Sequence, residues 1–174
     1  MTEIIYSKNV IDFVKLAADY CLKLEHCREA APRELVKAML GSLPYLYIKG
    51  NELTGTVEDN GLVADAQVTE DDYNYVRGGL YEVLGRYDEY LDVFVEEMKY
   101  SDKPILRSVS EDLADIYQDL RNFLATYRDG IDELMLAALY DVLDNFKTDW
   151  GQKCVNVLRA LHDILYQQMQ DEED

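Results

Sequence analysis

Cysteine and histidine are scarce in this sequence, and their spacing excludes the usual disulfide and zinc motifs. The 174 residues include three cysteines and two histidines. Cys21, Cys27 and Cys154 form no C-x-x-C pair and no cysteine–histidine cluster of zinc-site spacing. An odd number of unclustered cysteines argues against a disulfide framework and favours a reducing, cytoplasmic compartment.

Basic residues are outnumbered by acidic ones. Lys and Arg total 17 and Asp and Glu total 35, which gives a net charge of −18 at pH 7 and a pI near 4.3. Nucleic-acid phosphates and anionic membranes both select basic surfaces, so direct binding to either is not expected. The hydrophobic fraction of 48% is normal for a globular domain. The acidity therefore does not indicate disorder.

Long apolar runs and the best-known catalytic motifs are also missing. No uncharged stretch approaches the roughly 18 residues of a membrane span, and residues 1–6 show no signal-peptide pattern. The sequence contains no Walker loop, no G-x-G-x-x-G loop and no G-x-S-x-G nucleophile elbow. No cofactor is therefore expected, and the sequence argues against an enzyme more than for one.

Helical periodicity is the strongest signal that is present. Apolar residues recur at steps of three and four along most of the chain, and the links between these stretches are mostly short. We expect an all-α fold, a single-domain antiparallel helical bundle of six or seven helices over residues 1–170. The acidic residues 171–174 are expected to fray.

Several positions are expected to interrupt the helices. Pro44 should kink or end the second helix. Residues 49–68 lose the helical period and contain an Asn-Gly pair, which predicts a long loop or a small hairpin. Asp88 should cap a short helix that ends near residue 98. Gly151 should bend the last helical stretch or divide it in two.

The predicted fifth helix, which opens at Ser110, carries three aspartates on one flank. At about 100° per residue, Asp112 and Asp119 lie at the boundary between its apolar face and water, and Asp115 faces solvent unless another helix covers it. Such a line of acids is typical of a solvated helix edge, of a polar cluster between helices, or of oxygen ligands for a hard cation.

The last helical stretch places one aromatic and one basic residue on different sides. Trp150 lies on its apolar seam and is expected to anchor the core, whereas Arg159 lies roughly 150° away from that seam. An ion pair between Arg159 and Asp115 or Asp119 would give this arginine a structural role. The predicted polar cluster between the two helices comprises Asp112, Asp115, Asp119, Arg121, Trp150 and Arg159.

Short motifs in the C-terminal half resemble an uncharacterised bacterial helical family, labelled only as a domain of unknown function. The family pattern is similar to S-D-D-L-A-D, followed by D-L-R, W-G and L-R-A-L. The corresponding residues here are 110–115, 119–121, 150–151 and 158–161. Phe94-Val95-Glu96 departs from the family, which often has Phe-Asp-Pro there. The resemblance implies a helical, cytoplasmic, bacterial protein and carries no activity or substrate.

Three functions remain open. The favoured one is an acidic, cytoplasmic protein-interaction or adaptor module with a protein partner, since the 14 tyrosines beside acidic residues suit an interface. The first alternative is a metal-dependent phosphohydrolase that uses the acidic flank of the fifth helix, with His162 as a further ligand or base. The second alternative is a DNA mimic that binds a basic partner.

Overall fold

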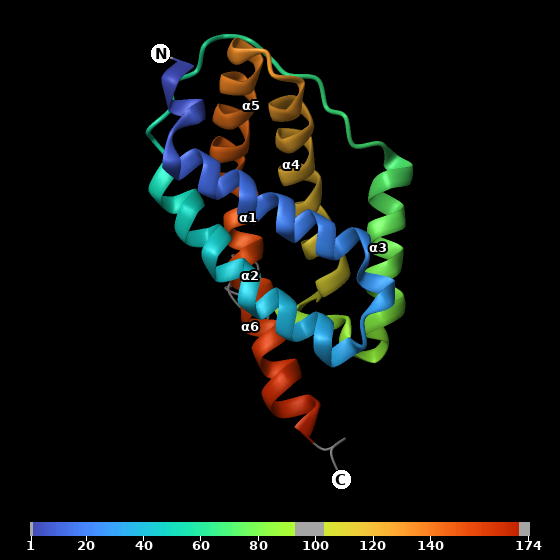
Figure 1. Ribbon diagram of the computed structural model, residues 1–174. Helices are drawn as coiled ribbons and strands as arrows, with labels where there is room; N and C mark the ends of the chain where they lie inside the picture. Colours follow the sequence, from blue (N-terminus) through green and yellow to red (C-terminus); the bar gives the residue numbers. More distant parts are fainter. Residues whose placement is uncertain (1, 93–102, 171–174) are drawn as a thin grey trace.

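The prediction of an all-α helical bundle is confirmed by the computed structural model, which describes residues 2–92 and 103–170 (Figure 1). The α-helices are α1 (Lys8–Glu25), α2 (Pro32–Leu53), α3 (Glu70–Leu84), α4 (Val109–Asp129), α5 (Asp132–Asn145) and α6 (Gly151–Asp163). Short 3₁₀ segments span Thr2–Tyr6, Cys27–Glu29 and Gly85–Tyr87, and π-helical segments span Phe146–Trp150 and Ile164–Gln168. No described helix is long and apolar enough to cross a membrane.

Helix α4 occupies the centre of the bundle. It packs against α1, α3, α5 and α6, and α1 and α2 form an antiparallel pair that crosses the other helices (Figure 1). The core of this arrangement is aromatic: the ring centroid of Phe13 in α1 lies 5.5 Å from that of Phe123 in α4 and 6.3 Å from that of Trp150. All three side chains are almost fully buried. Large aromatic side chains contribute strongly to core stability through their buried area.

Gly151 does not divide the last helical stretch. The π-helical segment Phe146–Trp150 joins α5 to α6, so the backbone is helical from Asp132 to Gln168. A Cβ at Gly151 would lie 2.4 Å from the carbonyl oxygen of Phe146, and a Cβ at Gly50 would lie 2.8 Å from its ring. The two glycines therefore provide the space that Phe146 occupies between α2 and α6.

The expectations for residues 44–68 are corrected in two ways. Pro44 does not end the second helix, because α2 continues through it to Leu53. The lost backbone hydrogen bond is outweighed by packing, since Leu43 and Leu46 on either side are completely buried. The loop between α2 and α3 is thus shorter than expected, and it crosses the ends of α5 and α4 without forming a hairpin (Figure 1).

The helix expected to begin at Asp88 is replaced by a strand. Residues Glu89–Asp92 (β1) pair in antiparallel fashion with Ile105–Ser108 (β2), with Tyr90 opposite Arg107. Asp88 does not cap a helix of its own. Instead its buried carboxylate accepts hydrogen bonds from the Ser110 backbone N–H (2.6 Å) and hydroxyl (2.8 Å) at the start of α4.

Three features from the sequence concern residues that the structure does not describe. The remainder of the helix expected up to residue 98 lies outside the described residues, and so does the Phe94-Val95-Glu96 departure from the family pattern. The same applies to the expected frayed tail at 171–174.

Candidate functional site

The acidic flank of α4 faces neighbouring elements and not open solvent. Asp112 is only 5% exposed and accepts a short hydrogen bond from the Tyr90 hydroxyl of β1. Asp115 accepts hydrogen bonds from the Tyr73 hydroxyl of α3 (2.6 Å) and from the Lys153 ammonium of α6 (2.8 Å). Neutral and charged donors from three elements therefore cover the flank that the helical period identified.

Lys153 is the cation in this row of acids. Its ammonium group also lies 2.9 Å from a carboxylate oxygen of Asp149, one turn earlier in the chain. Together, Asp112, Asp115, Asp119, Asp149 and Lys153 form a group that we call the polar column. Four carboxylates and one ammonium give it a formal charge of −3 if all are ionised, so full ionisation is electrostatically unfavourable.

Two carboxyl groups of the polar column resist ionisation. Burial raises the pKa of Asp112 to about 6, against the opposing effects of the Tyr90 hydrogen bond and the Lys153 charge. Burial also raises the pKa of Asp119 to about 6, and the nearby charges of Asp149 and Asp115 add to this rise. Lys153 and a hydrogen bond from Asn145 oppose it. Both groups therefore titrate close to neutral pH.

Three residues of the predicted cluster lie elsewhere. Arg159 donates a hydrogen bond to the Leu91 carbonyl oxygen of β1, so its expected pairing with Asp115 or Asp119 is wrong. Lys153, also on α6, pairs with Asp115 instead. Arg121 lines a separate hollow beside Glu25 and Asp72.

Trp150 also lies apart from the acids, as part of the core. It is fully buried, and its indole N–H donates to the Val142 carbonyl oxygen at 2.8 Å. This hydrogen bond satisfies the one polar group of the side chain within the continuous helical stretch of α5 and α6.

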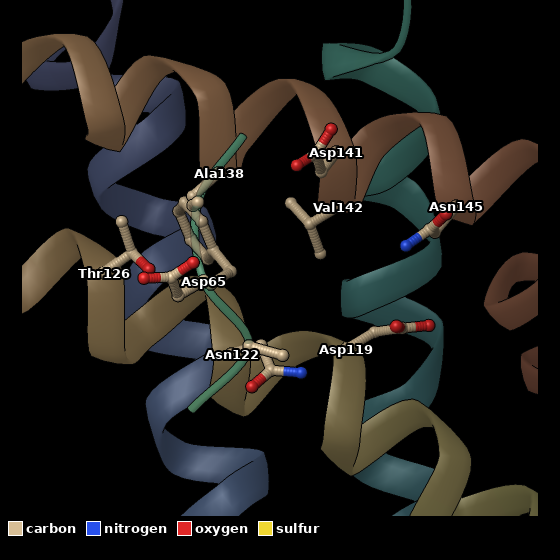
Figure 2. Close-up of a pocket in the computed structure, with 11 residues that line it drawn as sticks. Asp65, Asp119, Asn122, Thr126, Ala138, Asp141, Val142 and Asn145 are labelled. Atoms are coloured by element: carbon tan, nitrogen blue, oxygen red, sulfur yellow. The ribbon is translucent and has the colours of Figure 1, made fainter. Parts of the chain in front are cut away.

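The polar column ends at a pocket between α4, α5 and the loop that precedes α3 (Figure 2). Its volume is about 140 Å³. Its polar lining consists of Asp65, Asp119, Asn122, Thr126, Asp141 and Asn145. Of these six residues, only Asp119 is predicted from the sequence.

Helical spacing explains how the pocket is built. Asp119, Asn122 and Thr126 follow one another at steps of three and four on one face of α4, and Asp141 and Asn145 are four residues apart on α5. These steps are visible in the sequence. What the sequence does not indicate is that these two helical faces meet.

The loop over the pocket is fixed by specific hydrogen bonds, and we call its residues 60–68 the strap. The side-chain oxygen of Asn122 accepts the backbone N–H groups of Gln67 and Val68, both at 2.8 Å. The Asn60 side chain donates to the Glu133 carbonyl oxygen at 2.9 Å. These bonds tie the strap to both α4 and α5, and Asp65 of the strap thereby enters the pocket (Figure 2).

Among the described residues, no cation pairs directly with the carboxylates of the pocket, although the charge of Lys153 favours ionisation of Asp119. Asp65, Asp119 and Asp141 form no ion pair with a lysine or arginine in the described part of the chain. Burial raises the pKa of Asp141, and the nearby Asp59 and Asp144 reinforce this. The pocket is thus an electronegative site that offers oxygen acceptors to a cationic group.

The described residues offer little for metal-dependent hydrolysis. Within 2–92 and 103–170, no group of three or more His, Cys, Asp or Glu side chains is placed to hold one metal ion. Asp112 and Asp115 are occupied by Tyr90, Tyr73 and Lys153. His162 is exposed and packs against the Tyr166 ring, 4.8 Å between centroids.

Comparison with known proteins gives a family without an assigned activity. Residues 4–167 match the family described as "Domain of unknown function (DUF5063)". The crystal structure of protein BF1032 from Bacteroides fragilis is similar, with a TM-score of 0.83 and 37% sequence identity. The similarity covers 94% of this chain and 96% of that one. The curated proteins include no match to this sequence. The chain therefore belongs to the DUF5063 family.

Proposed function

We propose that this protein is an acidic interaction module that binds a basic segment of a partner protein. The observation that carries the proposal is the convergence of Asp65, Asp119 and Asp141 on one pocket without a lysine or arginine from the described residues. An unpaired carboxylate gains more from a cationic partner when it is partly removed from water. Asp119 is the most enclosed of the three.

The surroundings of the pocket support a protein partner. Val63 and Leu62 of the strap are 81% and 45% exposed, directly beside Ala64 and Asp65 of the pocket. Apolar side chains at the edge of a charged recess favour a partner segment that combines basic and apolar residues. The net charge of −18 would also speed association with such a segment through long-range attraction.

We also propose a cytoplasmic location for this interaction. Cys21, Cys27 and Cys154 are all free and buried, and burial raises the pKa of each thiol. Free thiols that remain protonated are compatible with a reducing compartment and need no disulfide partner.

Affinity capture from an extract of the native cell tests the proposed function. The bait is the full chain, the pocket variant Asp119→Asn/Asp141→Asn, or the control variant Glu89→Gln/Asp163→Asn. The control removes the same charge from exposed positions near β1 and the end of α6. We expect basic proteins that the wild type and the control capture and the pocket variant loses. Equal capture by both variants would contradict the proposal.

A further inference from the structure

The side chain of Thr126 shows that the pocket has room for a ligand atom. Thr126 is only 5% exposed and forms no hydrogen bond with any described residue. Among the described residues, no fully covered side-chain nitrogen or oxygen lacks a partner. The Thr126 hydroxyl is therefore the part of the side chain that the pocket leaves open. A helical threonine commonly satisfies its hydroxyl on the preceding turn, so this free hydroxyl points to an external partner.

The polar groups of the pocket lie at its two ends. In Figure 2, Thr126 and Asp65 stand at one end, and Asp119, Asp141 and Asn145 stand at the other. Thr126 follows Asp119 by seven residues on α4, so the two are separated by about 10 Å along the helix axis at 1.5 Å per residue. A ligand that contacts both ends must therefore carry polar groups several carbons apart.

Between these ends the pocket wall combines the Asn122 side chain with a group of apolar side chains (Figure 2). The apolar part of the wall is formed by Ala64, Ala66, Phe123, Ala138 and Val142. A volume of about 140 Å³ is well below the roughly 300 Å³ at which pockets for drug-sized ligands begin. The volume and the apolar part of the wall suit a slender alkyl chain.

We propose that the pocket binds a primary ammonium group carried on an alkyl chain of about four carbons. The ammonium donates to Asp119, beside the Asn145 side chain, the alkyl chain lies along Val142 and Ala138, and a second donor reaches Thr126 and Asp65. A compact ammonium with three donors can contact Asp119 of α4 and the Asn145 side chain beside it on α5, whereas a planar guanidinium favours two parallel bonds to one carboxylate. This inference rests on the proposed function in one respect only: a partner protein would be the source of the ammonium group.

Two sources share this chemistry. A lysine side chain of a partner has four methylenes, and its backbone N–H supplies the second donor. A free diamine such as 1,4-diaminobutane has the same chain length with an ammonium at each end. The two differ in whether the second donor is charged, so their relative affinities distinguish them.

Calorimetric titration of the intact chain at pH 7.5 and constant ionic strength tests the inference. The probes are 1,4-diaminobutane, Nα-acetyl-lysine methylamide and Nα-acetyl-arginine methylamide. We expect saturable binding of an ammonium probe at one site per chain, and binding of the arginine probe weaker by about tenfold. No saturable binding of either ammonium probe, or equal binding of the arginine probe, would overturn the inference.

Variants assign the binding to this pocket. Asp119→Asn should lower the affinity for the ammonium probe by about tenfold, which is the factor expected for the loss of one charge-assisted hydrogen bond. Thr126→Val, which lacks the hydroxyl, should also lower this affinity. Thr126→Ser, which keeps the hydroxyl, should bind the probe as the wild type does. The control Glu89→Gln/Asp163→Asn should bind as the wild type does. Binding that survives both Asp119→Asn and Thr126→Val would place the ammonium elsewhere and contradict the inference.

The source of the ammonium follows from the same data. Tighter binding of 1,4-diaminobutane assigns the pocket to a free diamine, and tighter binding of the lysine probe assigns it to a partner's lysine. Failure of the capture experiment with successful titration would reject the proposed function and retain the ammonium site. Successful pocket-dependent capture without binding of the ammonium probes would retain the proposed function and reject the ammonium site.

Discussion

The ammonium group of Lys153 on α6 lies 2.8 Å from a carboxylate oxygen of Asp115 on α4. Both side chains are mostly enclosed, with 21% and 30% of their surface exposed. The pair therefore joins the two helices at a place where water screens it only partly. It also supplies positive charge to the polar column, where it opposes the rise in the pKa of both Asp112 and Asp119.

Removal of the Lys153 charge should destabilise the protein. Lys153→Met leaves Asp115 and Asp149 without their shared cation, and we expect a loss of roughly 1–3 kcal/mol at pH 7. The matched control is Lys147→Met, because Lys147 pairs with Asp144 on an exposed surface and should cost less than about 0.5 kcal/mol. Urea denaturation measures both losses. Equal losses would mean that burial adds nothing to the Lys153 pair.

The protein should become more stable as the pH falls from 7.5 to 5.5. The pKa values of Asp112 and Asp119 rise from their ordinary 3.8 to about 6 in the folded protein. The folded state then binds protons more tightly than the unfolded state, so their ionisation costs stability above pH 6 and this cost disappears on the way down towards pH 4. Asp72, whose pKa is lowered by the Thr69 backbone N–H, has the opposite effect at still lower pH.

Melting temperatures across this pH range check the effect. Asp112→Asn/Asp119→Asn should be more stable than the wild type at pH 7.5, by on the order of 1–3 kcal/mol, and should show a flatter pH profile. A wild-type melting temperature that decreases from pH 7.5 to 5.5 would show that these two carboxyl groups do not have raised pKa values.

Two glycines within helices should respond to alanine in opposite directions. Gly151→Ala places a Cβ 2.4 Å from the Phe146 carbonyl oxygen and should destabilise the protein by about 1–3 kcal/mol. At Gly41, in the interior of α2, nothing lies within 4 Å of the added Cβ. Gly41→Ala should therefore stabilise the protein by up to about 1 kcal/mol. Thermal denaturation of the two variants measures the difference, and stabilisation by Gly151→Ala would contradict the observed packing of Phe146.

The strap should loosen when Asn122 is replaced. Asn122→Ala removes the acceptor for the Gln67 and Val68 backbone N–H groups and leaves the fold of α4 intact. We expect faster proteolytic cleavage within residues 60–68 and faster amide exchange at Gln67 and Val68. Gln118→Ala, at an exposed position of the same helix, is the control. Unchanged cleavage would show that the remaining contacts hold the strap.

The sequence predicted what depends on local periodicity. The helical period located the acidic flank of α4 and the buried position of Trp150, because side-chain direction within one helix follows from spacing. Burial decided the outcome at Pro44, where packing of Leu43 and Leu46 outweighs one missing hydrogen bond. Helix propensity and residue spacing do not show whether packing outweighs a lost hydrogen bond.

Features that depend on contacts between distant residues were missed. Arg159 follows Lys153 by six residues, which turns it about 240° around α6, and only the placement of α6 shows that Lys153 faces Asp115. Asp88 accepts a hydrogen bond at the start of α4 from 22 residues away, and the residues after it pair with β2 as a strand. The pocket needs the faces of α4 and α5 and the path of the strap, and no local pattern relates these three.

The most direct test of the acidic pocket as a recognition site is an NMR titration with a short leucine-rich peptide that contains one lysine. The control is the same peptide with its lysine ε-acetylated, which removes the charge and retains the chain. We predict saturable shifts of the Asn122 and Asn145 side-chain amide signals and of the Thr126 backbone amide with the charged peptide, and none with the acetylated one. Equal shifts with both peptides, or no shift at these three residues, would contradict the account.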